Sequence, residues 1–273
     1  MAIHKTEGLV LSTADWSESS QTLTIFTPDR GKLALSVRGS RQLNGKRGRP
    51  LRFARLEFTY YLREDSDHGY LSDVEPVEAF LFEKEGQLGR LTFASAAIEL
   101  LNNLLTTLDP QPVCYQITLS FLRMTDQLDK KRLPGLFAGY ILRLISLLGF
   151  RPNLVGCVGC GAEVTGTEDI EAPETAKVLI SIERGGVVCD NCRRAMIGQN
   201  QMVSLTVGLH AAMLRLMTSS LEEASQETLS LADLNRMVDL ITAHLKYHAG
   251  TIRQLKSFDF LDKLARAVKT YGG

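Results

Sequence analysis

The chain has 273 residues, which is enough for two domains of ordinary size. Hydrophobic residues make up 44% of it and charged residues 23%, values that are typical of a globular protein and exclude a disordered or fibrous chain as the overall class. Its 31 basic residues balance its 31 acidic residues, so a nucleic-acid partner can be argued only from a local excess of positive charge.

The first 79 residues predict a small β-barrel. Short apolar segments with period-two alternation are separated by turn residues about every ten positions. Pro28 and Gly31 mark one such turn, and alternate residues from Leu56 to Leu62 share one face of a half-buried strand. About five short strands in this length favour a closed barrel of the OB type, the commonest five-stranded solution.

After Pro76 the apolar spacing becomes helical. Three stripes of apolar residues recur at intervals of three and four, and the third ends at Gly149 with Pro152 just beyond it. Helical spacing resumes at Leu205, with Ser204 as the candidate cap. The predicted class is therefore α+β. The predicted domains are a barrel over residues 1–79, a helical domain made of residues 80–152 and 196–273, and an insert over residues 153–195.

The insert carries the ligand pattern of a structural zinc site. Cys157 and Cys160 form one C-x2-C pair, and Cys189 and Cys192 form a second pair after a spacer of 28 residues. Four thiolates would close a tetrahedral coordination sphere and leave no open position for water, which predicts one structural zinc per chain rather than a catalytic metal. The long spacer predicts a small hairpin between the pairs. Two unrelated cysteine pairs are the alternative, and Cys114, on an apolar stripe, is expected in the core.

The basic residues are concentrated between Arg30 and Arg55, where nine of them occur without a single acid. Long basic side chains on a glycine-hinged loop suit contacts with the phosphates of a single strand. A solvated charged loop with no ligand is the alternative. The candidate DNA-binding residues are Arg38, Arg41, Lys46, Arg47, Arg49, Arg52 and Arg55.

Aromatic residues and histidines supply weaker candidates. Tyr61, on the outward face of a predicted strand, is placed to stack on a base, and Trp16 and Tyr70 are weaker candidates for the same role. Core packing or surface hydrogen bonding is favoured for each of them. His244 and His248 lie four residues apart on a predicted helix, but no Glu follows His244, so the metalloprotease pattern fails.

Enzyme and membrane classes find no support in the sequence. It contains no GxxxxGK[ST], GxSxG or GxGxxG motif, which leaves nucleotide hydrolysis and nucleotide-cofactor chemistry without a site. No run approaches about 18 apolar residues, and His4, Lys5 and Glu7 stand where a signal peptide needs an apolar segment. A cytoplasmic location is expected, and paired cysteines in a reducing compartment favour a metal over disulfides.

The order of these features resembles the RecO family of bacterial recombination mediators, and the likeness runs through the whole chain. One departure is Ser19, where the family pattern leads us to expect an acidic residue or a tyrosine after Glu18. The segments that carry the resemblance are Leu9–Leu11, Trp16–Ser19, Leu23–Pro28, Gly31–Lys32, Val37–Gly39, Tyr140–Pro152, Cys157–Gly161, Gly185–Cys189 and Leu255–Leu261.

The resemblance implies a non-enzymatic protein of DNA repair and recombination, associated with the nucleoid. It implies binding to single- and double-stranded DNA, annealing of complementary strands, and action with RecR to load RecA onto strands coated by single-strand-binding protein. An alternative of another class is a protein-interaction scaffold that is stabilised by zinc and has only incidental affinity for nucleic acid. A zinc-dependent nucleic-acid-modifying enzyme ranks third.

Overall fold

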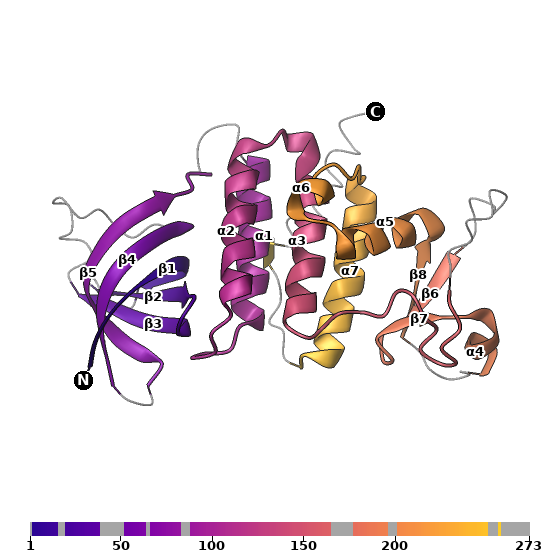
Figure 1. Ribbon diagram of the computed structural model, residues 1–273, viewed down its shortest axis with the longest axis horizontal. Helices are drawn as coiled ribbons and strands as arrows, with labels where there is room; N and C mark the ends of the chain where they lie inside the picture. The colour runs from indigo at the N-terminus through magenta and orange to yellow at the C-terminus, as the bar shows by residue number, and fades with distance from the viewer. Residues whose placement is uncertain are drawn as a thin grey trace. The chain divides into compact units, whose positions relative to one another are not determined.

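The structure is a computed structural model that describes residues 2–15, 20–38, 52–63, 66–82, 88–164, 177–195, 201–250 and 256–257. The chain divides into two compact units, residues 1–127 and 128–273. The first unit contains a barrel and two helices, and the second contains a small sheet and the remaining helices (Figure 1). Within the described ranges, no helix is both long enough and apolar enough to cross a membrane. The domain boundaries at residues 79, 152 and 195 stay a prediction.

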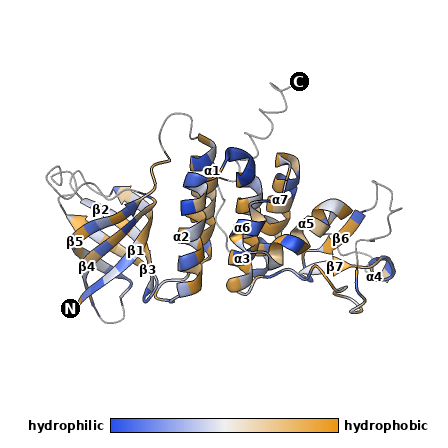
Figure 2. Ribbon diagram, turned by 45° about the horizontal axis from the view of Figure 1, so that its top comes forward, coloured by the Kyte–Doolittle hydropathy of each residue, from blue (hydrophilic) through white to orange (hydrophobic). Residues whose placement is uncertain are grey.

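The first five strands close into a barrel in the order β1-β2-β3-β5-β4. β3 and β5 pair in parallel, and the other neighbouring pairs are antiparallel. The predicted alternation in β4 is confirmed, because Leu56, Phe58, Tyr60 and Leu62 are buried in the barrel core. Figure 2 shows the same alternation of hydrophobic and hydrophilic residues along the barrel strands. The strands are β1 (Ala2–Asp15), β2 (Ser20–Thr27), β3 (Gly31–Arg38), β4 (Ala54–Leu62) and β5 (His68–Ala79).

Two helices, α1 (Leu88–Leu104) and α2 (Pro112–Gln127), complete the first unit. The connection between them reaches the barrel at the β2–β3 turn. There Gly31 has a φ of 71°, and an added Cβ would collide with the backbone of Asp109. Tyr115 of α2 packs edge-on against Phe26 of β2, with ring centroids 5.6 Å apart. The turn therefore requires glycine both for its conformation and for its close contact.

An ion pair joins β5 to α2. Arg123 donates to both carboxylate oxygens of Glu78, with Nε to Oε1 at 2.9 Å and Nη2 to Oε2 at 2.7 Å. The side chains are partly exposed, at 40% and 28%. This hydrogen bonding from Arg123 lowers the pKa of Glu78 against the opposing effect of burial. The two-pronged geometry makes the pair stronger than an ordinary surface salt bridge.

We expect Glu78→Gln to lower the free energy of unfolding by about 1 kcal/mol at neutral pH. Because the folded pKa of Glu78 is depressed, the stabilisation is present above the unfolded value of about 4.3 and is lost as the pH falls through the folded value. Urea unfolding at neutral pH and at about pH 3 measures the effect, which should shrink at the lower pH. Glu75→Gln, at an exposed position on the same strand, is the control. An equal loss in both variants would contradict the prediction.

The second unit is built around α3 (Leu133–Leu147), twelve of whose fifteen residues are buried. Gly135 and Gly139 let a neighbouring turn approach closely, since added Cβ atoms would meet the backbone and side chain of Ala224. The helix ends at Leu147, two residues before the predicted stop at Gly149, whose φ is 85°. The other helices are η1 (Lys130–Arg132, a 3-10 helix), α4 (Asp190–Ala195), α5 (Val207–Thr218), α6 (Leu221–Ala224) and α7 (Leu231–His248).

The sheet of the second unit has the order β7-β6-β8. The hairpin predicted between the cysteine pairs is confirmed as β6 (Lys177–Ser181) and β7 (Gly186–Val188). The helix start predicted at Ser204 is wrong, because β8 (Met202–Thr206) pairs with β6 through that position. The cap is Thr206, whose hydroxyl accepts from the backbone N–H of Leu209 at 3.2 Å. The predicted class, an OB-type barrel followed by helices with a four-cysteine module, is confirmed.

Candidate functional site

The four cysteines predicted as metal ligands lie together in the second unit. The Sγ atoms of Cys157, Cys160, Cys189 and Cys192 are all within 4.8 Å of one another. Those of Cys160 and Cys189 are 3.7 Å apart. Sulfurs bound to zinc at about 2.3 Å in a tetrahedron lie about 3.8 Å apart, so the spacing fits a tetrahedral ion. The cluster could therefore hold a metal ion.

Local backbone structure brings each pair into position. The first pair lies on a tight knuckle closed by two bonds, from the N–H of Gly161 to the carbonyl of Cys157 at 2.8 Å and from the N–H of Cys157 to the carbonyl of Ala162 at 2.7 Å. Gly161 has a φ of 77°, which explains the glycine after the second ligand. Cys189 follows β7, and Cys192 lies in the first turn of α4.

Backbone hydrogen bonds also join the two halves of the cluster. The segment after α3 runs beside β7, where Asn153 donates to Gly185 at 2.9 Å and accepts from Val187 at 2.8 Å. Val158 then donates to the carbonyl of Val187 at 2.9 Å. Gly186 leaves no room for a side chain, because a Cβ there would collide with the backbone of Asn153. The ligand pairs are thus aligned by the peptide backbone itself.

The electrostatics of the cluster favour one thiolate before any metal is considered. Cys157 is only 2% exposed, and burial acts to raise its pKa. Backbone N–H groups nonetheless point at its sulfur, at 3.3 Å from Cys189 and 3.4 Å from Gly159, and such bonds lower its pKa to about 6. Hydrogen bonding with Cys160 and Cys189 raises the pKa of Cys192 to about 12. The thiolate is the form of cysteine that binds a metal ion. The lowered pKa of Cys157 therefore favours its role as a metal ligand.

The candidate DNA-binding residues are only partly described. Arg41, Lys46, Arg47 and Arg49 lie outside the described residues, between the point where the chain leaves the barrel at Arg38 and the point where it re-enters near Arg52. Nothing in the described structure tests their role, which stays a prediction.

The two candidates nearest β4 have visible contacts. The guanidinium carbon of Arg52 lies 4.8 Å from the ring centroid of Phe53. Arg55 forms an ion pair with Glu7, Nη2 to Oε2 at 2.5 Å, and this hydrogen bond raises its pKa. The pairing of Arg55 joins residues 48 positions apart and was not foreseen from the sequence. Both residues stay predictions as DNA ligands.

The outer face of the barrel brings two of the aromatic candidates together. Tyr61 of β4 pairs directly with Tyr70 of β5, and the two residues are 37% and 39% exposed. Directly paired residues project to the same face of a sheet, so the two rings share a surface. Trp16 lies outside the described residues. Sequence reasoning missed this adjacency, because the register that pairs the two strands is set by the whole barrel.

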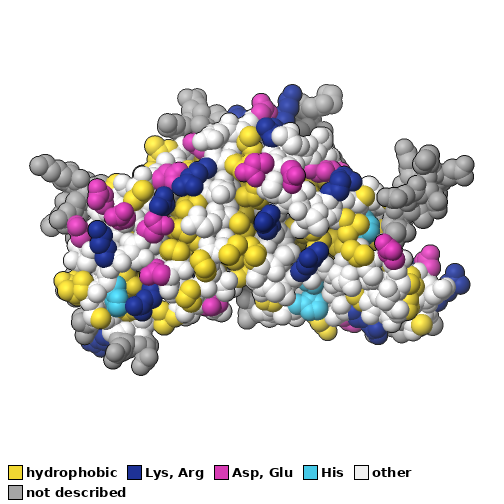
Figure 3. Space-filling model, viewed as in Figure 1, with side chains coloured by type: hydrophobic (Ala, Val, Ile, Leu, Met, Phe, Trp, Pro, Cys, Tyr) yellow, Lys and Arg dark blue, Asp and Glu magenta, His cyan; other side chains and the backbone are white. Residues whose placement is uncertain are grey.

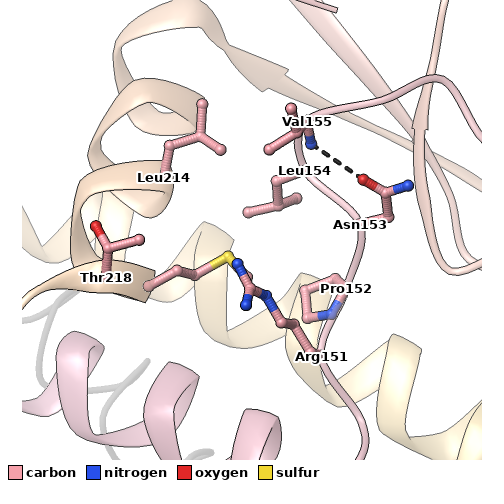
Figure 4. Close-up of a pocket in the computed structure, with 8 residues that line it drawn as sticks. Arg151, Pro152, Asn153, Leu154, Val155, Leu214 and Thr218 are labelled. Atoms are coloured by element: carbon pink, nitrogen blue, oxygen red, sulfur yellow. Dashed lines mark hydrogen bonds between the residues drawn. The ribbon is translucent and has the colours of Figure 1, made fainter. Parts of the chain in front are cut away.

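Two cavities were not singled out from the sequence. One, of about 430 Å³, lies at the β2–β3 turn and is lined in part by His4, Arg30 and Arg63. The other, of about 300 Å³, lies between residues 151–155 and α5. Figure 4 shows Leu154, Val155 and Leu214 around it, with the dashed bond from Val155 to Asn153. The second cavity is mostly apolar, and of the lining residues that the structure describes only Arg151 is charged.

The surface visible in Figure 3 carries acidic and basic side chains side by side over its described part. This mixture agrees with the net charge of zero. The described charges on this face are therefore mixed and do not form a broad basic field.

Comparison with known proteins covers nearly the whole chain. The family described as Recombination protein O N terminal matches residues 1–80, and the family described as Recombination protein O C terminal matches residues 85–257. The DNA repair protein RecO of Symbiobacterium thermophilum is 29% identical over 269 residues, which cover 98% of this chain and 100% of that protein. The DNA repair protein RecO of Anaeromyxobacter dehalogenans strain 2CP-C is 30% identical over 261 residues, or 95% and 96% of the two chains. The chain therefore belongs to the RecO family, whose role is in DNA repair and recombination.

Proposed function

We propose that the protein is a DNA-binding recombination mediator that binds and anneals single strands and, with RecR, helps to load RecA in recombinational repair. Family membership supplies the role in repair. The observation that carries the DNA-binding proposal is the connection between β3 and β4. This connection and the residues at its ends hold seven of the chain's basic residues and no acid, on a closed five-stranded barrel.

The basic connection supports binding without sequence readout. Lys and Arg side chains neutralise backbone phosphates and release counterions, which favours any strand alike. Two strands bound in this way can approach each other, because the cations screen their mutual repulsion. No bond is made or broken in this process, so the proposed activity needs neither a catalytic residue nor a nucleotide.

We also propose that the four-cysteine cluster holds one zinc ion with a structural role. The cysteines Cys157, Cys160, Cys189 and Cys192 would hold it, and four sulfur ligands leave no position for a reacting water. The ion would cross-link the segment after α3 to the start of α4. A structural role for the ion agrees with the proposal that the protein is a mediator rather than an enzyme.

One observation favours protein contacts in addition to DNA binding. The cavity between residues 151–155 and α5 is mostly apolar, and Arg151 is the one charged residue among the described residues that line it. Such chemistry suits a short apolar peptide segment that also carries a negative charge. We propose that the contact with single-strand-binding protein lies in this helical part. The alternative of a pure protein scaffold is distinguished by salt-dependent binding to an oligonucleotide, which the scaffold would lack.

The protein is expected to accelerate annealing of complementary oligonucleotides in the absence of ATP. Binding through phosphates brings two strands together at low salt, and no phosphate-cradling motif is present to couple the reaction to a nucleotide. Fluorescence quenching between labelled strands, bare or coated with single-strand-binding protein, measures the rate with and without ATP.

Non-complementary strands of the same length are the control for aggregation, and they should give no quenching. If bare complementary strands anneal no faster with the protein at low salt, the annealing proposal is wrong. A strict requirement for ATP would reveal a nucleotide site that the sequence does not show.

A further inference from the structure

A polar cavity of about 530 Å³ lies beside the C-terminal end of α7, and none of the described residues that line it is a cysteine. Its lining comes from three segments: the segment that follows α3, the β6–β7 turn, and α7. None of the described residues that line it is acidic. Its polar and charged lining consists of Arg151, Asn153, Arg184, His244 and His248.

The two histidines are held by backbone carbonyls on one side. Nε2 of His244 lies 3.1 Å from the carbonyl oxygen of Phe150, and Nε2 of His248 lies 2.8 Å from that of Ile182. A carbonyl can only accept, so each Nε2 carries a proton and each Nδ1 is left for another partner. Their ring centroids are 4.4 Å apart. The two rings therefore lie side by side in the lining of the cavity.

The histidine on the inner side lacks a second partner. His244 is 5% exposed, and its buried Nδ1 has no hydrogen-bond partner among the described residues. A buried polar atom without a partner is costly, and in a native structure it calls for an explanation. Burial, and then the neighbouring His248, lower the pKa of His244, so the ring is neutral when nothing negative is near. The Nδ1 of a neutral ring can only accept, so the charged donors available to an anion among the described lining residues are the two arginines.

The shape of the cavity is fixed by its backbone. Gly185 has a φ of 71° at the β6–β7 turn, and a Cβ there would lie 3.3 Å from Nε2 of His248 and 3.4 Å from Cε1 of His244. Asn153 donates to the carbonyl of this glycine at 2.9 Å. The turn is thus tied both to the segment after α3 and to the histidines. A cavity held on three sides can present its cations in a constant arrangement.

We propose that this cavity binds a phosphate group, whose oxygens accept hydrogen bonds from Arg151 and Arg184 beside the rings of His244 and His248. Arginine forks match the geometry of a phosphate, and the absence of acids among the described lining residues removes the competing acceptor. The phosphate comes either from the backbone of a DNA strand or from a free phosphate ion. The first of these sources rests on the proposed function, and the second does not.

The test is a titration with inorganic phosphate at constant ionic strength, balanced with chloride, and monitored through the histidine ring signals by NMR. The chain has only five histidines, which makes the ring signals separable. The signals of His244 and His248 should shift saturably with phosphate. In Arg151→Ala/Arg184→Ala the apparent affinity should fall by about 10-fold or more, because charge-assisted bonds are lost. Both arginines are exposed, so their replacement leaves the core intact.

Lys246→Ala supplies the matched control, since it removes an exposed cation from the same helix outside this cavity. This variant should bind phosphate like the wild type. A response to phosphate that equals the response to chloride, or that survives the double substitution, overturns the proposal.

A second arm of the experiment identifies the source of the phosphate. A short single-stranded oligonucleotide is titrated into the same sample, and its binding is followed separately by fluorescence anisotropy. Shifts of the same two histidines would identify a DNA phosphate, and shifts with inorganic phosphate alone would identify a free ion. If anisotropy detects no binding of the oligonucleotide, the proposed function is contradicted. The titration with inorganic phosphate then still decides whether the cavity binds phosphate.

Discussion

If the cluster holds zinc as proposed, replacing Cys160 with serine is expected to release the ion and to lower the free energy of unfolding of the second unit by several kcal/mol. The residue is exposed, so the substitution removes almost no buried surface, and the loss must come from the metal. For a unit of this size, each kcal/mol lowers the Tm by roughly 2–4 °C. Elemental analysis of protein purified without chelator, together with a thermal melt, measures both effects. Cys189→Ser is expected to behave in the same way.

Cys114→Ser is the matched control for this prediction. Cys114 is buried in α2, belongs to the first unit and takes no part in the cluster. Burial raises the pKa of its thiol to about 11, as expected of a packed, unreactive side chain. Its replacement should disturb packing but leave the zinc content at one per chain. The prediction is wrong if Cys160→Ser keeps both its zinc and the Tm of the wild type.

The effect of zinc loss should be confined to the module around it. The backbone bonds between Asn153, Val158 and β7 do not involve sulfur, and α3 is buried by its own neighbours. Chelation should therefore loosen the knuckle and α4 while the other helices of the second unit stay folded. Hydrogen exchange after removal of the metal should locate the change in these segments.

The four-cysteine cluster and the barrel could be predicted because both depend on local patterns. A C-x2-C pair requires only that two thiolates converge on one ion, and the alternation in β4 requires only that one face of a strand be buried. The strands of the barrel were visible for the same reason. Their closure and register depend on every strand together, so the side-by-side position of Tyr61 and Tyr70 could not be read from the sequence.

The wrong boundary at Ser204 shows how tertiary pairing overrides a local signal. A serine before an apolar periodic run is a good cap, and Thr206 offers the same chemistry two residues later. The start of the helix is determined by pairing with β6, whose backbone pairs with residues 202–206 and extends the strand past Ser204. The ion pair of Arg55 with Glu7 and the cavity lined by Arg184 and His244 likewise join distant segments, which no spacing rule can connect.

The largest effect on DNA binding is expected from reversing the charge of the β3–β4 connection. If about four to six phosphates of a single strand are neutralised, log K should fall with log salt with a slope of roughly −3 to −4. Reversal of the four central cations to Glu removes those contacts and adds repulsion. Affinity at low salt should then fall by about two orders of magnitude or more, and the slope should flatten, for all sequences alike. The residues to reverse are Arg41, Lys46, Arg47 and Arg49.

The salt dependence and the affinity of DNA binding, measured together, distinguish direct contacts made by the β3–β4 connection from an effect of net charge alone. Lys130→Glu/Lys131→Glu alters the net charge as much as Arg47→Glu/Arg49→Glu does, at two exposed residues of the second unit. A long-range field would weaken binding similarly in both double variants, whereas direct phosphate contacts would flatten the slope only in the second. If affinity and slope both survive the fourfold reversal, the connection is only solvated charge. The binding surface would then have to be sought elsewhere, beginning near Lys256 and Lys263.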